Sequence, residues 1–219
     1  LSFATLLLIT SNLSFAQIHI SGPQTGVLVD TTYIVDSAIS VPSGSSLTIQ
    51  PGAIILFNGP AFNINGYLHA VGTMADSIVF MRNSSSTSWS GIAFSDTAAD
   101  SCIMEYCLIY NAHSTSGTIK CNLVSPTFRH CTIRRNWSIL SGGGFRLTYS
   151  NALIDQCVFD HNSSFDWGAG ISCEWSSPVI SNCIFRGNYP KSTSGFRGGI
   201  GGAIWLRYSG SALINNCLF

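Results

Sequence analysis

The sequence predicts an all-β protein that winds into a parallel β-helix (solenoid), with about three short strands per coil of roughly 26 residues. One observation is a cysteine-led phrase that returns after 24, 26, 26 and 34 residues, at Cys107, Cys131, Cys157, Cys183 and Cys217. The other is a glycine-led phrase that runs in step with it, at residues 117–121, 144–147, 170–173 and 202–206. A repeat of this length marks units that cannot bury an apolar face alone, so the units must stack.

Apolar residues alternate with polar ones inside each phrase, as at Cys157 and Phe159. Alternation over three to six residues, bounded by Gly, Asn, Ser and Pro, indicates strands and not helices. The strands of one coil are typified by residues 170–175, 178–180 and 183–185. Asn182 and Asn216 stand directly before the third strand, where a residue that tolerates the left-handed conformation would make the bend.

Aligning the coils by their cysteines predicts columns of stacked side chains, because each strand pairs with its counterpart about 4.8 Å away on the next coil. Three inward columns are expected, two of them apolar and one largely aromatic: Met104/Phe128/Ile154/Ile180/Ile214, Ile109/Ile133/Phe159/Phe185/Phe219 and Leu123/Tyr149/Trp175/Tyr208. Two outward columns alternate in charge: Glu105/Arg129/Asp155 and Arg134/Asp160/Arg186. Since opposite charges on adjacent strands stabilise by roughly 0.2–1 kcal/mol a pair, the alternation independently supports the register.

Four segments are expected along the chain. Residues 1–16 hold a short apolar run followed by small residues, which is typical of a secretory signal peptide without its basic start; a buried strand is the alternative. Residues 17–40 are expected to form an N-terminal cap, 41–98 the irregular first coils, and 99–219 the regular repeats. Because the chain opens with Leu1 and ends within a predicted strand at Phe219, truncation is expected at both ends.

Composition narrows the classes of partner. Ten basic residues balance ten acidic ones without a basic cluster, which argues against nucleic acid as a partner. No stretch approaches the ~18 unbroken apolar residues of a membrane span. Only 9 % of the chain is charged, which suits a monomeric, extracellular solenoid with a polar, weakly charged surface.

Eight cysteines in an exported chain invite a disulfide interpretation. The repeat favours free, buried thiols instead. Cys121 and Cys173 share a column with Leu147 and Leu206, so the position takes a small-to-medium hydrophobic side chain, which a free cysteine supplies. The parallel Cβ vectors of in-register neighbours also suit a disulfide poorly. Cys102 lies outside both cysteine columns, and no metal site is expected.

A family resemblance is carried by three runs of residues: Val41-Pro-x-Gly-x-x-Leu-Thr-Ile-x-Pro-Gly52, then Asn65-Gly66-x-Leu68-x-Ala70-x-Gly72, and Ile78-x-Phe80. They resemble the start of bacterial secreted right-handed parallel β-helix proteins of the pectin-lyase-like superfamily. The later runs Ser177-Pro-x-Ile-x-Asn-Cys183-x-Phe-x-x-Asn188 and Gly201-Gly-Ala-Ile204 resemble repeats of the polymorphic outer-membrane-protein type. The resemblance implies a right-handed solenoid that is secreted or displayed on the outer cell surface of a bacterium. It says little about activity, because one scaffold serves lyases, hydrolases and passive surface proteins.

Under that resemblance, lyases bind Ca²⁺ through clustered carboxylates and abstract a proton with a basic residue. The weak catalytic candidates here are Asp155, Asp160 and Arg186, but all three fall in the charge-alternating columns and are expected to be surface ladder pairs. No catalytic residue and no cofactor is therefore expected, with Ca²⁺ implied only for a lyase. The asparagines Asn111, Asn136, Asn162 and Asn188 are expected to form a turn ladder that hydrogen-bonds the backbone, with Asn111 one residue out of register.

Binding candidates come from an enlarged turn at residues 189–200, because long loops on a rigid solenoid often carry function. The expected contacts to a ligand are Tyr189 and Phe196 in this turn, Trp205 just after it, and Trp167 and Trp137 in the turns of the two preceding coils. Aromatic rings on a polar face could stack on sugars, whereas the alternative is that they shield loop backbone. The sequence thus predicts a non-catalytic secreted or cell-surface scaffold for adhesion or contact with polysaccharide or cell-surface glycan. A polysaccharide lyase or glycoside hydrolase is the alternative.

Overall fold

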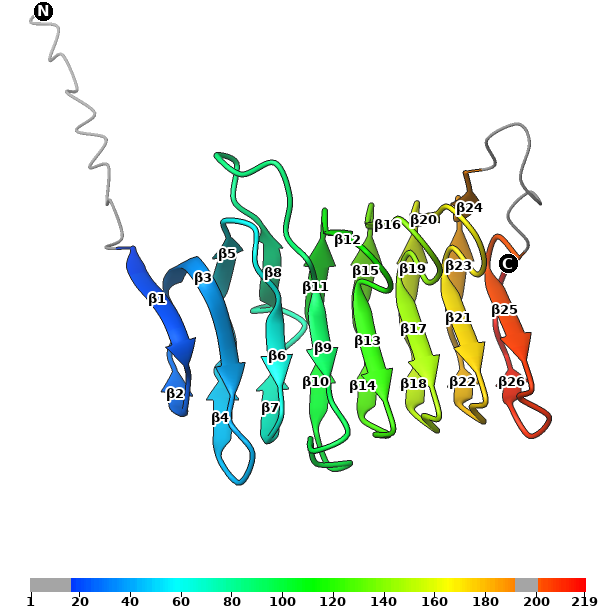
Figure 1. The fold of residues 1–219 in the computed structure, drawn as a ribbon, viewed down its shortest axis with the longest axis horizontal. Coiled ribbons are helices and arrows are strands. Elements are labelled where there is room, and N and C mark those ends of the chain that lie inside the picture. The colour runs from blue at the N-terminus through cyan, green and yellow to red at the C-terminus, as the bar shows by residue number, and fades with distance from the viewer. Residues whose placement is uncertain (1–16, 192–200) are drawn as a thin grey trace, which may run out of the picture.

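A computed structural model describes residues 17–191 and 201–219, and it is an all-β solenoid whose coils follow one another along a single axis (Figure 1). Every regular element in these two ranges is a β-strand, and every strand pairing is parallel. The predicted fold class is confirmed. Within the described residues, no helix is long or apolar enough to cross a membrane.

The largest sheet has 14 strands and wraps around the solenoid as two arms that meet at the long strand β3. The strands shared by both arms are β1 (Ile18–Pro23) and β3 (Thr32–Val41). The first arm consists of β5 (Ile54–Phe57), β8 (Ile78–Arg82), β11 (Cys107–Tyr110), β15 (Thr132–Arg134), β19 (Val158–Asp160) and β23 (Ile184–Arg186). The second arm consists of β6 (Phe62–Ile64), β9 (Ile92–Phe94), β13 (Ile119–Asn122), β17 (Phe145–Thr148), β21 (Ile171–Glu174) and β25 (Ile204–Arg207).

A second sheet of eight strands closes the other side of the coils. It consists of β2 (Gly26–Leu28), β4 (Ser46–Ile49), β7 (Tyr67–Val71), β10 (Ile103–Glu105), β14 (Thr127–Arg129), β18 (Leu153–Asp155), β22 (Val179–Ser181) and β26 (Leu213–Asn215). A third sheet, which the sequence did not predict, has four two-residue strands: β12 (His113–Ser114), β16 (Trp137–Ser138), β20 (Ser163–Ser164) and β24 (Tyr189–Pro190). Its strands are too short and too polar to leave an alternating pattern.

The first coils are irregular in length, yet they pair in the same parallel manner. In the segment expected to be a cap, β1 pairs with β3, and the register shifts between Ile20 and Gly22. The core runs without interruption from these coils through the regular repeats. The large side chain of Trp89 lies fully within it and stacks on Phe57, with ring centroids 4.5 Å apart.

The two apolar inward columns have the predicted register, with Met104 opposite Phe128 and Ile133 opposite Phe159. Their members are buried except in the last coil, where Ile214 and Phe219 are exposed. All eight cysteines are free; seven of them are buried, and Cys217, which was expected in the buried column, is partly exposed. Cys102, which the repeat left unexplained, lies under the turn before β7, where its sulfur accepts a hydrogen bond from the Leu68 amide at 3.2 Å.

The prediction of a third inward column was wrong. Leu123, Tyr149, Trp175 and Tyr208 are about half exposed, between 48 % and 57 % of each residue. The alternation of each strand predicts an inward side chain two residues after Cys121 and Cys173, but the four residues at this position have φ between 49° and 58°. A left-handed residue turns the chain and redirects its own side chain, so the alternation ends there and the rings face solvent.

Left-handed residues also mark the other bends of each coil. Asn182 and Asn216 have φ of 55° and 48°, as expected, but the same column contains Tyr106, His130 and Gln156. The preference of asparagine for the left-handed conformation therefore identified two members of this column. The other members adopt the same conformation because they occupy the equivalent position of a stacked coil. Asn111, at φ 59°, belongs to a further such column, which explains why it is one residue out of step with the other asparagines.

Candidate functional site

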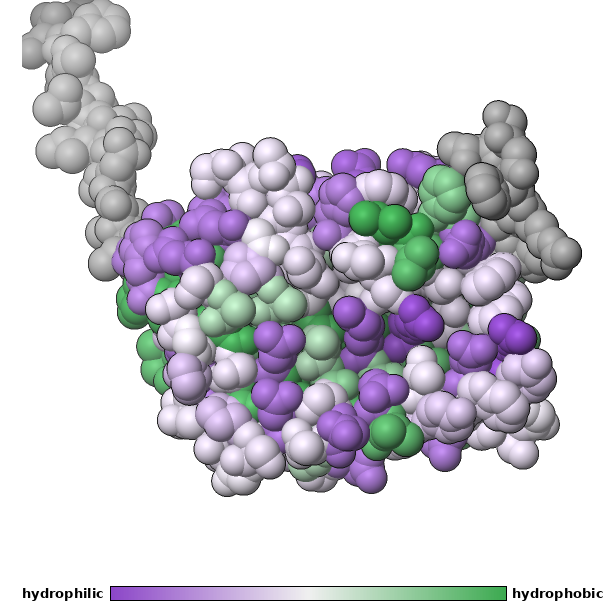
Figure 2. All heavy atoms as spheres, viewed as in Figure 1, coloured by the Kyte–Doolittle hydropathy of each residue, from purple (hydrophilic) through white to green (hydrophobic). Residues whose placement is uncertain are grey.

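The outward side of the second arm gathers the polar and aromatic side chains that are not used inside the solenoid. Its strands β13, β17, β21 and β25 pair in register, so their outward residues form two rows, Lys120/Arg146/Ser172/Trp205 and Asn122/Thr148/Glu174/Arg207. Figure 2 shows this side of the molecule, with strongly hydrophilic side chains over the middle of these strands. Nothing in the repeat requires two adjacent cations here.

A hollow of about 350 Å³ opens between β13 and β17. We call it the cationic pocket, and its polar lining consists of Ser116, Lys120, Asn122, Arg146 and Thr148. The Arg146 guanidinium donates a hydrogen bond to the Ser116 hydroxyl, which holds that side chain over the hollow. The pocket thus presents two cations together with hydroxyl and amide groups.

Lys120 and Arg146 are directly opposite each other on adjacent strands. Like charges in this position destabilise a sheet. Burial and, secondly, the charge of Arg146 lower the pKa of Lys120 below its ordinary value of 10.5. Among residues 17–191 and 201–219, neither side chain forms an ion pair with a carboxylate. Two adjacent strands thus present a pair of like, uncompensated charges in this hollow.

An aromatic strip lies along the edge of the same face, directly after these strands. It consists of Tyr149, Trp175 and Tyr208, whose rings stack from coil to coil with centroids 6.1 Å and 4.1 Å apart. Because the ring faces are turned toward one another, the strip presents ring edges to solvent. Tyr149 directly follows the pocket residue Thr148, so the strip and the cationic pocket adjoin.

Of the predicted binding residues, the structure brings Trp167 and Trp205 together, with ring centroids 5.0 Å apart and planes 11° from parallel. Trp205 lies on the outward row of the cationic pocket, two coils beyond Arg146. Each indole therefore covers one face of the other and leaves the second face for packing or for a ligand.

The remaining predicted binding residues lie elsewhere. Trp137 is not equivalent to Trp167; it belongs to the small third sheet, where Ser163 separates it from Tyr189. Its ring packs on His113 with centroids 4.0 Å apart, and the Lys191 ammonium lies 5.2 Å from its centre. Phe196 lies outside the described residues.

The weak catalytic candidates lie on other sides of the solenoid. The Asp160 carboxylate is almost fully buried and lies between Arg134 Nε at 2.9 Å and Arg186 Nε at 3.0 Å. His161 Nδ1 lies 2.6 Å from it. Burial would raise the pKa of Asp160, but the hydrogen bonds from His161 and Arg186 and the charge of Arg186 outweigh it, so the pKa lies below 3.8. A carboxylate held ionised by its own neighbours is a poor general acid.

The Asp155 carboxylate is likewise hydrogen-bonded by side chains of the next coil. It accepts hydrogen bonds from the Ser181 hydroxyl at 2.6 Å and the Asn182 amide at 2.7 Å. The Ser181 bond is the largest cause of the lowered pKa of Asp155. The expected pairing of Asp155 with Arg129 is present in the register of the strands but not as an ion pair.

The asparagines form a buried ladder inside the turn. Asn136 Nδ2 donates to Asn162 Oδ1 at 3.0 Å, and Asn162 Nδ2 donates to Asn188 Oδ1 at 3.0 Å. Each amide also bonds backbone: Asn162 Nδ2 donates to the Ile133 carbonyl at 2.8 Å, and Asn136 Oδ1 accepts from the Ala112 amide at 2.8 Å. This satisfies polar groups that the bend would otherwise leave unpaired.

The cysteine column Cys107, Cys131, Cys157, Cys183 and Cys217 lines the inside of the first arm. Each thiol lies within reach of a backbone carbonyl, as Cys157 does of Asp155 at 3.3 Å. Burial raises the pKa of Cys107 well above its ordinary value, and it raises that of Cys173 in the second arm to about 12. Buried, protonated thiols act as small hydrophobic residues.

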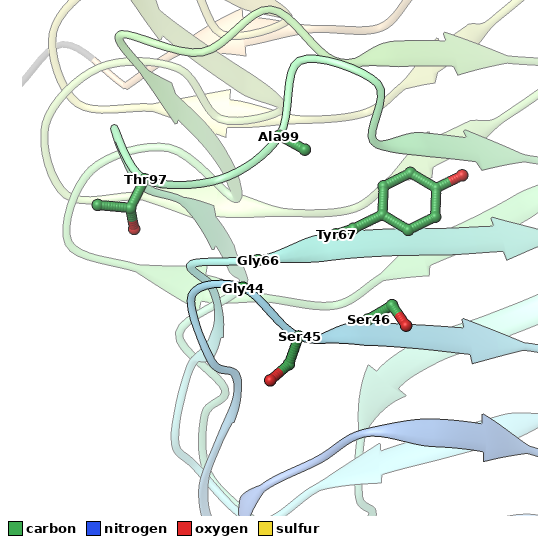
Figure 3. Close-up of a pocket in the computed structure, with 7 residues that line it drawn as sticks. All are labelled: Gly44, Ser45, Ser46, Gly66, Tyr67, Thr97 and Ala99. Atoms are coloured by element: carbon green, nitrogen blue, oxygen red, sulfur yellow. The ribbon is translucent and has the colours of Figure 1, made fainter.

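Another hollow, of about 310 Å³, lies near the N-terminal end, where β4 and β7 begin. Figure 3 shows its lining of small and polar residues, with Tyr67 the only large side chain drawn: Gly44, Ser45, Ser46, Gly66, Tyr67, Thr97 and Ala99. It contains no charged group. The cationic pocket is therefore the better candidate for recognition of a ligand.

Comparison with known proteins agrees with this architecture. The family model of the right handed beta helix region matches residues 70–219, which is more than half of the chain. The chain belongs to the right-handed β-helix family. No curated protein and no solved structure matches it. Family membership establishes the hand of the helix, and it leaves ligand and activity open because the fold serves many functions.

Sequence reasoning missed the cationic pocket of this right-handed β-helix. The signal was present, because Lys120 and Arg146 are 26 residues apart and stand between inward residues of equivalent phrases. The cysteine register would have placed them opposite each other. The pair differs from the charge-alternating columns because both of its members are cations.

Proposed function

We propose that this protein is a non-catalytic, secreted or cell-surface β-helix scaffold that contacts carbohydrate through the outer face of β13, β17, β21 and β25. The observation that carries the proposal is the cationic pocket with the aromatic strip directly beside it. Polysaccharides are extended and repetitive, and a flat face with side chains repeated from coil to coil suits such a ligand. Hydroxyl, amide and ammonium groups would bind sugar hydroxyls, while the ring edges give apolar contact.

The engaged state of the carboxylates supports a non-catalytic role. Asp160 is held by two arginines, Asp155 by Ser181 and Asn182, and Glu174 by Arg207 at 3.3 Å. Glycoside hydrolysis needs two carboxyl groups at a set separation, one of them with a raised pKa. Asp155 and Asp160 have lowered pKa values instead. No carboxylate lines the cationic pocket.

The test is a screen of the purified protein against neutral and acidic polysaccharides, with and without Ca²⁺. Binding is followed by calorimetry, and turnover by formation of double bonds and reducing ends. We expect binding without turnover. Trp175→Ala should weaken binding about tenfold, or about 1.4 kcal/mol, by removing the centre of the aromatic strip.

Tyr189→Ala is the matched control, since Tyr189 is about as exposed as Trp175 but belongs to the third sheet. It should leave affinity within twofold of the wild type. Turnover of any polysaccharide would overturn the non-catalytic assignment. Loss of binding in Tyr189→Ala with none in Trp175→Ala would move the contact surface to the third sheet.

A further inference from the structure

We infer that the cationic pocket is a built subsite for one anionic group of the glycan, a sulfate or a carboxylate, held directly by Lys120 and Arg146 without a bridging metal ion. The inference deepens the proposed function and rests on it. It begins from the register of β13 and β17, which places the two cations opposite each other. A like-charged pair costs stability in the free protein, and a bound anion would turn that cost into a gain.

The surroundings of the pair favour an oxyanion as the occupant. Arg146 is oriented by its hydrogen bond to the nearly buried Ser116, and the planar guanidinium retains further N–H groups. Guanidinium groups match carboxylate and sulfate oxygens in geometry, while the Lys120 ammonium adds a second charge from the adjacent coil. Asn122 and Thr148 add an amide and a hydroxyl at the same hollow.

The charge distribution favours an acidic glycan over a nucleic acid. A polyphosphate backbone is bound by many cations along one surface, and its affinity comes from the release of many counterions. Here the chain has no net charge, and the rows that leave the pocket continue into Ser172 and Trp205, and into Glu174 and Arg207. One local cation pair beside an aromatic strip fits a sugar that carries a single negative group.

No divalent cation is needed in this arrangement. In residues 17–191 and 201–219, no cluster of three or more His, Cys, Asp or Glu side chains could hold a metal ion. The pocket supplies positive charge from its own side chains. Binding of the acidic sugar should therefore persist in a chelator.

Two pairs of polysaccharides test the inference, because the members of each pair share a sugar backbone and one of them lacks the anionic group: dextran sulfate against dextran, and polygalacturonate against its methyl ester. Affinities are measured in EDTA at fixed ionic strength. We expect one charged member to bind at least tenfold more tightly than its neutral partner, and the pair that shows it distinguishes sulfate from carboxylate. Lys120→Gln and Arg146→Gln should each reduce that preference at least fivefold.

Arg129→Gln is the matched control, since it makes the same change in net charge on a different sheet. It should leave the preference within twofold, and thermal unfolding of all variants shows whether they are folded. Equal affinity for charged and neutral members would overturn the anion subsite and leave the proposed carbohydrate contact standing. Absence of binding to any glycan would overturn the proposed function itself. An equal loss in Arg129→Gln, or equally tight binding of duplex DNA, would show general charge attraction and overturn the subsite.

Discussion

The two arms of the 14-stranded sheet are alike inside and different outside. Inside, both carry apolar residues and buried thiols, such as Cys157 in the first arm and Cys173 in the second. Outside, the first arm places Asp160 between two arginines, whereas the second places Lys120 opposite Arg146. Folding constrains the inside of both arms in the same way. On the first arm Asp160 is paired with arginines of its own chain, whereas on the second arm Lys120 and Arg146 have no such carboxylate partner among the described residues.

The largest effect is expected from making the second arm resemble the first. Arg146→Asp would place a carboxylate opposite Lys120 and fill the pocket with an internal ion pair. We expect affinity for the preferred acidic polysaccharide to fall at least 100-fold, or about 2.8 kcal/mol, while the melting temperature stays level or rises. Calorimetric titration and thermal unfolding measure the two quantities. Unchanged affinity would show that the pocket plays no part in binding.

Breaking the compensated column should instead reduce stability. Asp160→Asn removes a buried charge that accepts hydrogen bonds from Arg186 and His161, and we expect a loss of about 2 kcal/mol in the free energy of unfolding at pH 7. Because the folded-state pKa of Asp160 is lowered from 3.8, its contribution is complete above about pH 4 and is lost as the pH falls through that lowered value. Urea unfolding at pH 7 and near pH 3 measures the difference in the free energy of unfolding between Asp160→Asn and the wild type.

Asp155→Asn is the comparison variant, because the partners of Asp155 include the neutral residues Ser181 and Asn182. It should lower the free energy of unfolding by about 1 kcal/mol. A difference between Asp160→Asn and wild type that persists unchanged at low pH would contradict the account.

Removing one cation of the second arm should change the free energy of unfolding by a smaller amount and should increase it. Lys120→Met retains most of the side-chain volume and relieves the repulsion, so we expect the free energy of unfolding at pH 7 to rise by about 0.5 kcal/mol. Because the folded-state pKa of Lys120 is lowered, its charge destabilises below that pKa, and the difference should disappear as the pH rises through 10.5. Arg134→Met in the first arm should reduce stability under the same conditions, since it removes an ion pair with Asp160. A stabilised Arg134→Met would show that the two columns do not differ in the way described.

The smallest effect is expected inside, where the arms agree. Burial raises the pKa of Cys107 in the first arm and of Cys173 in the second, so neither thiol should react with an aromatic disulfide reagent at pH 8 while the protein is folded. In denaturant without reductant, all eight thiols should react. Partly exposed Cys217 serves as the positive control in the folded protein. Fewer than eight reactive thiols after unfolding would reveal a disulfide.

The regular coils were readable because a parallel stack places equivalent residues opposite each other. Once the cysteines set the register, the neighbours of Phe159 and of Asp160 followed, and the structure has them as predicted. The prediction failed at Trp175, because a period of two applies only while the chain is extended, and a left-handed residue ends it. The two-residue strands of the third sheet, which include Trp137, were also not predicted, since so short a segment shows no alternation of apolar and polar residues.

The sequence by itself determined the fold class, the register of the coils and the two apolar columns of the core, because all three follow from a repeat that each coil must share with its neighbours. Only the tertiary structure decided which outward side chains meet in a hollow. That depends on where each left-handed residue turns the chain, on Ser116 orienting Arg146, and on Trp167 reaching Trp205. These contacts join residues of different coils, so a site made of them appears only when the coils are wound together.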